Sequence, residues 1–175
     1  MSSIGLVIAL MSYGYLETDW FDQTVFGCKT SIETKTVRGH SMEPLLRDGT
    51  DVRVLVGYYA CHTPDRGDIA VLHYVGNDVP IIKRVFAVPG DAFRVISDGD
   101  NSKIEINGQI AVNSAGIAYS FSGSQAKMLK LYEESAHGPL PSDAYLVLGD
   151  QVEGSLDSTR FGLIGLENFV GKADR

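Results

Sequence analysis

Two residues, Ser41 and Lys83, occupy sequence settings in which their side chains are suited to covalent chemistry. Ser41 stands in a turn between Gly39 and Pro44, whereas Lys83 lies inside an apolar, strand-like run where an ammonium group is costly to bury. A serine hydroxyl is a weak nucleophile until a base within hydrogen-bond reach accepts its proton. Burial lowers the pKa of a lysine, so a neutral amine can be that base. The two residues therefore suggest a Ser–Lys nucleophile–base pair, although each also has a plain interpretation, as a turn former and a surface lysine.

The four histidines are weaker candidates for the base. His40 adjoins Ser41, but adjacent residues of an extended chain point to opposite faces, so His40 is badly placed to accept the Ser41 proton. The other three, His62, His73 and His137, have no motif around them and are interpreted as structural. The cysteines are not spaced as metal ligands. The sequence therefore predicts neither a metal site nor a cofactor.

The composition is that of a folded globular protein and disfavours a polyanionic partner. The chain has 175 residues, 44% of them hydrophobic and 21% charged, which is enough for one domain with an ordinary core. Its 22 acidic residues exceed its 15 basic residues, and the formal net charge is −7. Because no basic block is present, we expect no binding to nucleic acid. The oligomeric state is left open.

Short alternating segments predict a mostly β fold with antiparallel strands. No alternation of strands with helices supports a parallel sheet, and Asn107-Gly108 between two alternating runs is a strong hairpin signal. The expected strands cover residues 30–37, 51–56, 68–75, 79–88, 92–96, 103–112 and 144–148, and residues 166–173 are expected to form a short helix or strand.

The predicted organisation is a main β domain over residues 30–175 with a less regular insertion at about 98–142. Within the insertion, residues 113–142 combine a Ser-Gly-Ser segment, a charged patch and a Gly/Pro loop. This composition predicts an added strand or hairpin with little chemistry of its own.

The N-terminal segment, residues 1–29, contains an apolar run from Ile4 to Leu16. Its 13 residues fall short of the roughly 20 that span a bilayer as a helix, and no basic residue precedes it as in a secretory signal. Three interpretations stay open: a short membrane anchor, a helix packed on the domain, or an interfacial segment. Cys28 and Cys61 form a disulfide only if the compartment is oxidising and the geometry permits it.

Three ordered blocks are similar to those of the type I signal peptidases. The blocks are Gly39 to Leu46, Lys83 to Asp91, and Gly149-Asp150 followed by Ser155 to Gly162. The resemblance covers roughly residue 36 to the C-terminus. It implies a signal-peptidase-like antiparallel β domain, with Ser41 as the nucleophile and Lys83 as the general base.

The resemblance also assigns supporting roles. The main-chain N–H of Ser41 is expected to bind the developing oxyanion, and Gly39 lacks the hydroxyl that some members place there as a second donor. Ser155 is expected to orient the lysine amine. Asp157 is expected to pair with Arg160, and Gly149 and Asp150 open the loop that carries these residues.

Three features depart from the family pattern. Gln151 replaces an asparagine in the third block, and Arg160 is displaced by one position after Asp157. The chain ends soon after Gly171-Lys172-Ala173, so the final strand is expected to be short or missing.

The resemblance implies an endopeptidase that cleaves signal peptides from exported precursors, at a membrane and on its extracytoplasmic side. Met42, Leu46 and Ile82 are expected to line shallow pockets for small residues, or else to pack in the core. The alternatives are a self-cleaving repressor-like peptidase, a conjugation-type maturation peptidase, and a catalytically inactive β domain that binds extended peptides.

Overall fold

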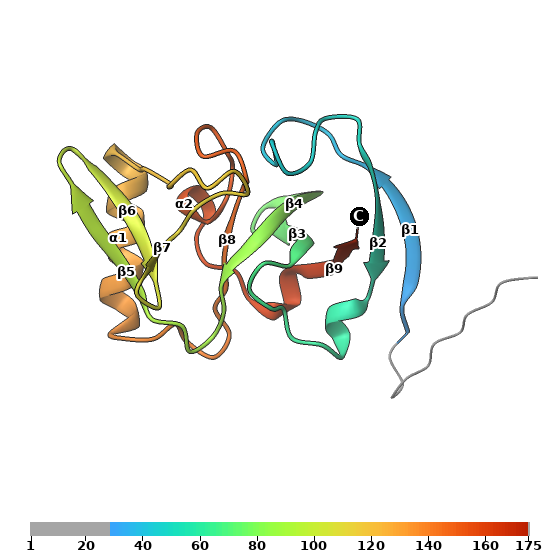
Figure 1. Ribbon diagram of the computed structural model, residues 1–175. Helices are drawn as coiled ribbons and strands as arrows, with labels where there is room; N and C mark the ends of the chain where they lie inside the picture. Colours follow the sequence, from blue (N-terminus) through green and yellow to red (C-terminus); the bar gives the residue numbers. More distant parts are fainter. Residues whose placement is uncertain (1–28, 175) are drawn as a thin grey trace, which may run out of the picture.

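The computed structural model describes residues 29–174, which form a large sheet, a small sheet and two α-helices (Figure 1). The large sheet contains β1 (Ser31–Thr36), β2 (Asp51–Val56), β3 (Ile69–Tyr74), β4 (Asn77–Ala87), β8 (Leu146–Leu148) and β9 (Phe169–Asp174). All of its paired strands are antiparallel. The prediction of a mostly β, antiparallel fold is therefore confirmed.

The large sheet places its strands in the order β1-β2-β9-β3-β4-β8. β1 and β4 are separated by three strands, yet residues from both line one cavity, so the sheet curls. Within the described residues, β1 pairs with β2 alone. β8 pairs with β4 only from Arg84 onward, which leaves the first half of β4 with one unpaired edge within the described chain.

The final strand, β9, is present and central. It pairs with β2 on one side and with β3 on the other. The expectation that this strand would be short or missing is therefore wrong, because the last residues of the chain already supply the pairing partner that both neighbours need. A 3-10 turn, η2 (Leu166–Asn168), leads into it, and a second, η1 (Tyr58–Ala60), follows β2.

A second, smaller unit follows β4 in the chain and lies at the opposite end of the molecule from β1 (Figure 1). It contains β5 (Phe93–Asp98), β6 (Asn101–Ile106), β7 (Gln109–Ile110) and α1 (Gly123–Ala136). The β6–β7 hairpin forms where Asn107-Gly108 predicts it, with both residues at positive φ. The 14-residue helix α1 was not expected from the sequence, and its Leu129 is buried in the core of this unit.

Three clusters of buried apolar side chains hold the elements together. One joins the small unit to β8, and another lies on the large sheet around Tyr59 and Tyr145. The third packs Met42 and Leu46 against valines of β2 and β3. It therefore anchors the segment that carries Ser41 directly to the sheet.

Several predictions fall on residues 1–28. The apolar run from Ile4 to Leu16 lies outside the described residues, and so does Cys28, whose pairing with Cys61 the sequence leaves open. Within residues 29–174, no helix is long and apolar enough to cross a membrane.

Candidate active site

Ser41 lies in a tight turn that immediately follows β1. Gly39 has φ +84°, a conformation that favours glycine, and its N–H donates to Asp48 Oδ1 at 2.8 Å. The Glu43 N–H donates to the His40 carbonyl oxygen at 3.0 Å, which closes the turn around Ser41. Met42, the next residue, is fully buried. The turn is thus fixed on both sides of the serine.

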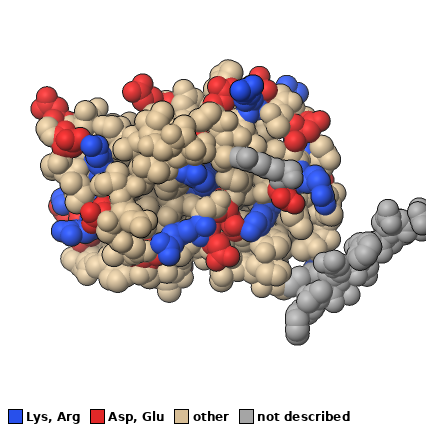
Figure 2. All heavy atoms as spheres, in the orientation of Figure 1, with Lys and Arg blue, Asp and Glu red and all other residues tan. Residues whose placement is uncertain are grey.

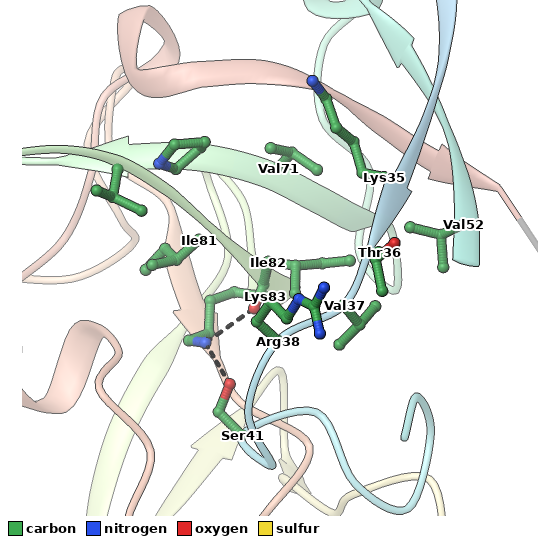
Figure 3. A pocket seen from close by; sticks show the side chains of 12 residues that line it. Lys35, Thr36, Val37, Arg38, Ser41, Val52, Val71, Ile81, Ile82 and Lys83 are labelled. Carbon is green, nitrogen blue, oxygen red and sulfur yellow. Dashed lines mark hydrogen bonds between the residues drawn. The ribbon is translucent and has the colours of Figure 1, made fainter. Parts of the chain in front are cut away.

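Lys83 comes from the middle of β4 and is only 3% exposed. It shares the alternation of buried residues with Val85 and Ala87 along this strand. Its Nζ lies 2.8 Å from Ser41 Oγ and donates at 2.8 Å to the carbonyl oxygen of Ile82 (Figure 3). The structure thus brings together the two residues that the sequence analysis selected for chemistry.

The surroundings of Lys83 favour its neutral form. Burial lowers the pKa of Lys83 from 10.5 to about 8, and the nearby charge of Asp157 opposes this shift without cancelling it. A substantial fraction of the amine is therefore unprotonated slightly above neutral pH. In that form Lys83 can accept a proton from Ser41 Oγ across the 2.8 Å contact.

A cavity of about 350 Å³ opens beside Ser41 and Lys83. Its walls come from β1, β2, β3 and β4 and are mostly apolar, and Ile82 is part of them. Met42 and Leu46 do not line it: both are buried in the core, in the cluster that also includes the wall residues Val52 and Val71. Of the three residues expected at substrate pockets, the structure therefore places only Ile82 at the cavity surface.

Comparison with known proteins identifies the family. The model of the family described as "Signal peptidase, peptidase S26" matches residues 21–175. Signal peptidase IB of Staphylococcus aureus (strain COL) is 32% identical over 145 residues, which cover 78% of this chain and 73% of that protein. The chain belongs to the signal peptidase family, peptidase S26.

Two further relatives are similar to this chain. Signal peptidase I P of Bacillus subtilis subsp. natto is 29% identical over 142 residues, covering 79% of this chain and 73% of that protein. The crystal structure of a signal peptidase I from Enterococcus faecalis V583 aligns with a TM-score of 0.45 at 22% identity, covering 63% of this chain and 97% of that chain. The family predicted from the three sequence blocks is thus the one that the comparisons show.

The third block of this S26 family member forms the loop that follows β8 and the short helix α2 (Ser158–Phe161). Asp157 caps α2: its Oδ1 accepts from Thr159 N at 3.1 Å and from Thr159 Oγ1 at 2.7 Å. Its Oδ2 accepts from Gly149 N at 3.1 Å. The buried carboxylate therefore ties both ends of the loop together.

The expected ion pair between Asp157 and Arg160 does not form. Arg160 is exposed, and its Nε donates to the Ser155 carbonyl oxygen at 3.2 Å. The physical reason is the one-residue displacement of the arginine, because Thr159 now occupies the preceding position and its hydroxyl satisfies the carboxylate.

Ser155 and Gly149 pack closely behind Ser41. Ser155 Oγ is buried and has no hydrogen-bond partner within residues 29–174. A Cβ on Gly149 would lie 2.5 Å from the Ser41 carbonyl oxygen and closer still to Ser155 Oγ. The expected role of Ser155 in orienting the Lys83 amine stays a prediction, since no bond between the two side chains is present among the described contacts.

Asp150 is the centre of a buried polar network that the sequence analysis missed. The carboxylate, fully buried, accepts from Leu45 N at 3.2 Å and from Ser114 N at 3.0 Å. The Ser114 hydroxyl donates to it as well, and Arg84 Nη1 lies 3.6 Å from Oδ1. Asp150 therefore connects the serine turn, β4 and the loop of the inserted unit. No local pattern around Ser114 indicates this long-range contact.

Replacing Ser114 by alanine is expected to lower the free energy of unfolding by about 2 kcal/mol, since hydrogen bonds to buried charged groups contribute roughly 1.5–3 kcal/mol. Urea denaturation of both forms measures the change. Ser142, an exposed loop serine, supplies the control, and Ser142→Ala is expected to leave stability unchanged. Equal stability of Ser114→Ala and the unchanged chain would contradict the network's role.

The main-chain N–H of Ser41, which is expected to bind the oxyanion, is not engaged within the described residues. Gly39 contributes no hydroxyl, and its own N–H is engaged by Asp48. His40 is exposed, and its Nδ1 lies 3.0 Å from Glu43 Oε1, a contact that raises the pKa of His40.

Proposed function

We propose that the chain is a membrane-associated serine endopeptidase that removes signal peptides from exported precursor proteins. The single observation that carries this proposal is the buried Lys83 amine 2.8 Å from Ser41 Oγ, at the wall of an apolar cavity. Membership of the S26 family supports the reaction class and the substrate class.

Catalysis proceeds through an acyl-enzyme. Ser41 Oγ attacks the scissile carbonyl carbon while its proton passes to Lys83 Nζ, and the Ser41 N–H stabilises the oxyanion that develops. Lys83 then donates that proton to the leaving amine, which departs with the new N-terminus. A water molecule, deprotonated by the same amine, hydrolyses the ester and restores Ser41.

The substrate lies extended between two unpaired strand edges. One edge is β1, and the other is the first half of β4, where neither strand has a second partner within the described residues. Main-chain hydrogen bonds to these edges provide affinity that does not depend on the side chains of the substrate. The apolar wall around Ile82, Val52 and Val71 leaves limited room, which favours small residues near the cut.

Contact with a lipid surface is supported by apolar side chains exposed at the cavity wall, on β1 and at the β3–β4 turn. Val79, a wall residue, is 67% exposed, Val75 at the β3–β4 turn is 90% exposed, and Ile32 on β1 is 60% exposed. Exposed apolar groups of this kind bind membrane interfaces. We place the catalytic domain on the extracytoplasmic side, where signal peptides emerge.

The proposal is tested by cleavage of a model precursor at varied pH, with the cut site mapped by mass spectrometry. Because Lys83 must be neutral, kcat/KM is expected to rise with pH and to level off above an inflection near 8, the pKa of Lys83. Below the inflection it falls about tenfold per pH unit.

A peptide with the same composition in scrambled order is the control for nonspecific hydrolysis. A profile that stays flat between pH 6 and 9, or an inflection above pH 10, would contradict a lysine base of lowered pKa. Failure to cut any signal-peptide junction would refute the substrate assignment.

A further inference from the structure

One positive charge in the cavity wall has no partner among residues 29–174. The wall contains three basic residues, Lys35, Arg38 and Lys83. Lys35 is paired with Glu33 at 2.6 Å, and Lys83 is engaged by Ser41. Arg38 is exposed and makes no hydrogen bond or ion pair to any residue in 29–174. Its guanidinium is therefore available to a ligand in the cavity.

Arg38 lines the same cavity as Ser41 and Lys83. It precedes Ser41 by three residues in the segment that runs from β1 along the cavity to the nucleophile. Figure 3 shows its side chain among the residues around the Ser41–Lys83 pair, near Val37 and Ile82. A peptide whose carbonyl reaches Ser41 Oγ must pass close to Arg38.

The surroundings make this charge selective. Apolar walls focus the field of a charge in a concave site, so its effect exceeds that at an open surface. Over the rest of the molecule acidic residues outnumber basic ones, and Figure 2 shows both kinds interspersed on one face. Arg38 thus places a positive charge at the substrate cavity of a chain whose net charge is negative.

We propose that Arg38 is a specificity-determining residue that favours precursors with an acidic side chain next to the scissile bond and disfavours those with lysine or arginine there. The proposal rests on the proposed endopeptidase function. The Arg38 guanidinium attracts an aspartate and repels a lysine of the substrate, and the two effects add. The preference for Asp over Lys in kcat/KM is therefore expected to be about tenfold, the equivalent of 1.4 kcal/mol.

The test measures kcat/KM for a precursor peptide in which Asp, Ser or Lys is placed in turn at each position near the cut. The unchanged chain is expected to prefer Asp to Lys about tenfold at one or more positions. Arg38→Gln is expected to reduce this ratio to about one, Arg38→Glu to invert it, and Arg38→Lys to retain its direction. Lys127→Glu, an exposed change on α1, is the matched control and is expected to keep the original ratio.

Two further readouts separate charge selection from a structural effect. High salt is expected to shrink the ratio in the unchanged chain, since an exposed charge is screened. Between pH 7 and 9 the ratio is expected to stay constant while kcat/KM itself rises, because a guanidinium does not titrate there.

A ratio within about twofold at every position, or an undiminished ratio in Arg38→Gln, would overturn the proposal. Either result leaves the proposed endopeptidase function intact. If the unchanged chain cleaves none of the peptides, including the neutral parent, both the endopeptidase function and the role of Arg38 would be overturned.

Discussion

Replacing Ser41 by alanine is expected to lower kcat/KM for a precursor by at least about a thousandfold, because no other hydroxyl is within reach of Lys83 Nζ in the described structure. Loss of a nucleophile typically removes most of the catalytic effect, and only oxyanion and binding contributions remain. The substitution deletes one oxygen from a turn held by main-chain bonds and by Met42, so the fold is expected to persist.

Two measurements check this expectation. Cleavage of a precursor reports activity, and labelling by a serine-directed acylating reagent reports the nucleophile itself; both are expected to vanish together. Ser142→Ala, which changes an exposed serine far along the chain, is expected to retain both. Undiminished cleavage by Ser41→Ala would refute the mechanism, whereas peptide binding without cleavage or labelling in the unchanged chain would indicate an inactive peptide-binding domain.

Replacing Lys83 by methionine is expected to abolish cleavage to a similar extent and to stabilise the protein near neutral pH. The pKa of Lys83 falls from 10.5 in the unfolded chain to about 8 in the folded one. At pH 7 the folded protein therefore holds a buried charge that costs roughly 3 kcal/mol. Methionine removes the charge but also the two hydrogen bonds of the amine, so we expect a net gain of about 2 kcal/mol.

The stability gain has a defined pH dependence. Between pH 8 and 10.5 the unfolded state binds more protons at Lys83 than the folded state, so the unchanged protein gains stability as the pH rises. The advantage of Lys83→Met is thus expected to be largest below pH 8 and lost by about pH 10.5. Urea unfolding at pH 7 and at pH 10 measures it, with Lys127→Met, an exposed lysine, as control. A gain of equal size at both pH values would argue against a buried, neutral amine.

The strands were predictable because their burial alternates along the chain. In β2, Val52 and Val54 are buried while Asp51 and Arg53 are exposed, which is the pattern that the sequence displays. The helix α1 lacks an equally clear pattern. Gly123 and Ser124 begin it, both poor helix formers, and only Leu129 is buried along its length. Packing against the small sheet, and not local preference, therefore determines its structure.

The site was predictable only in part, for a related reason. Ser41 and Lys83 stand in short motifs whose residue types already suggest a nucleophile–base pair, and the family resemblance strengthened that assignment. The contacts of Asp150 with Leu45 and Ser114 join residues 105 and 36 positions away, so no local pattern contains them. Thr159, which directly precedes Arg160, donates its hydroxyl to Asp157 in place of the expected arginine.

The tight fit at Gly149 has a consequence for how sequence variation in such enzymes is interpreted. No side chain can enter between the Ser41 carbonyl and Ser155 without moving the nucleophile. A mutational scan would therefore find position 149 about as intolerant as position 41, although glycine supplies no reacting group. Intolerance at position 149 would report the short separation between the Ser41 turn and the loop that carries Ser155. Because Gly149 has no Cβ, the two can approach closely, and this approach fixes the position of Ser41.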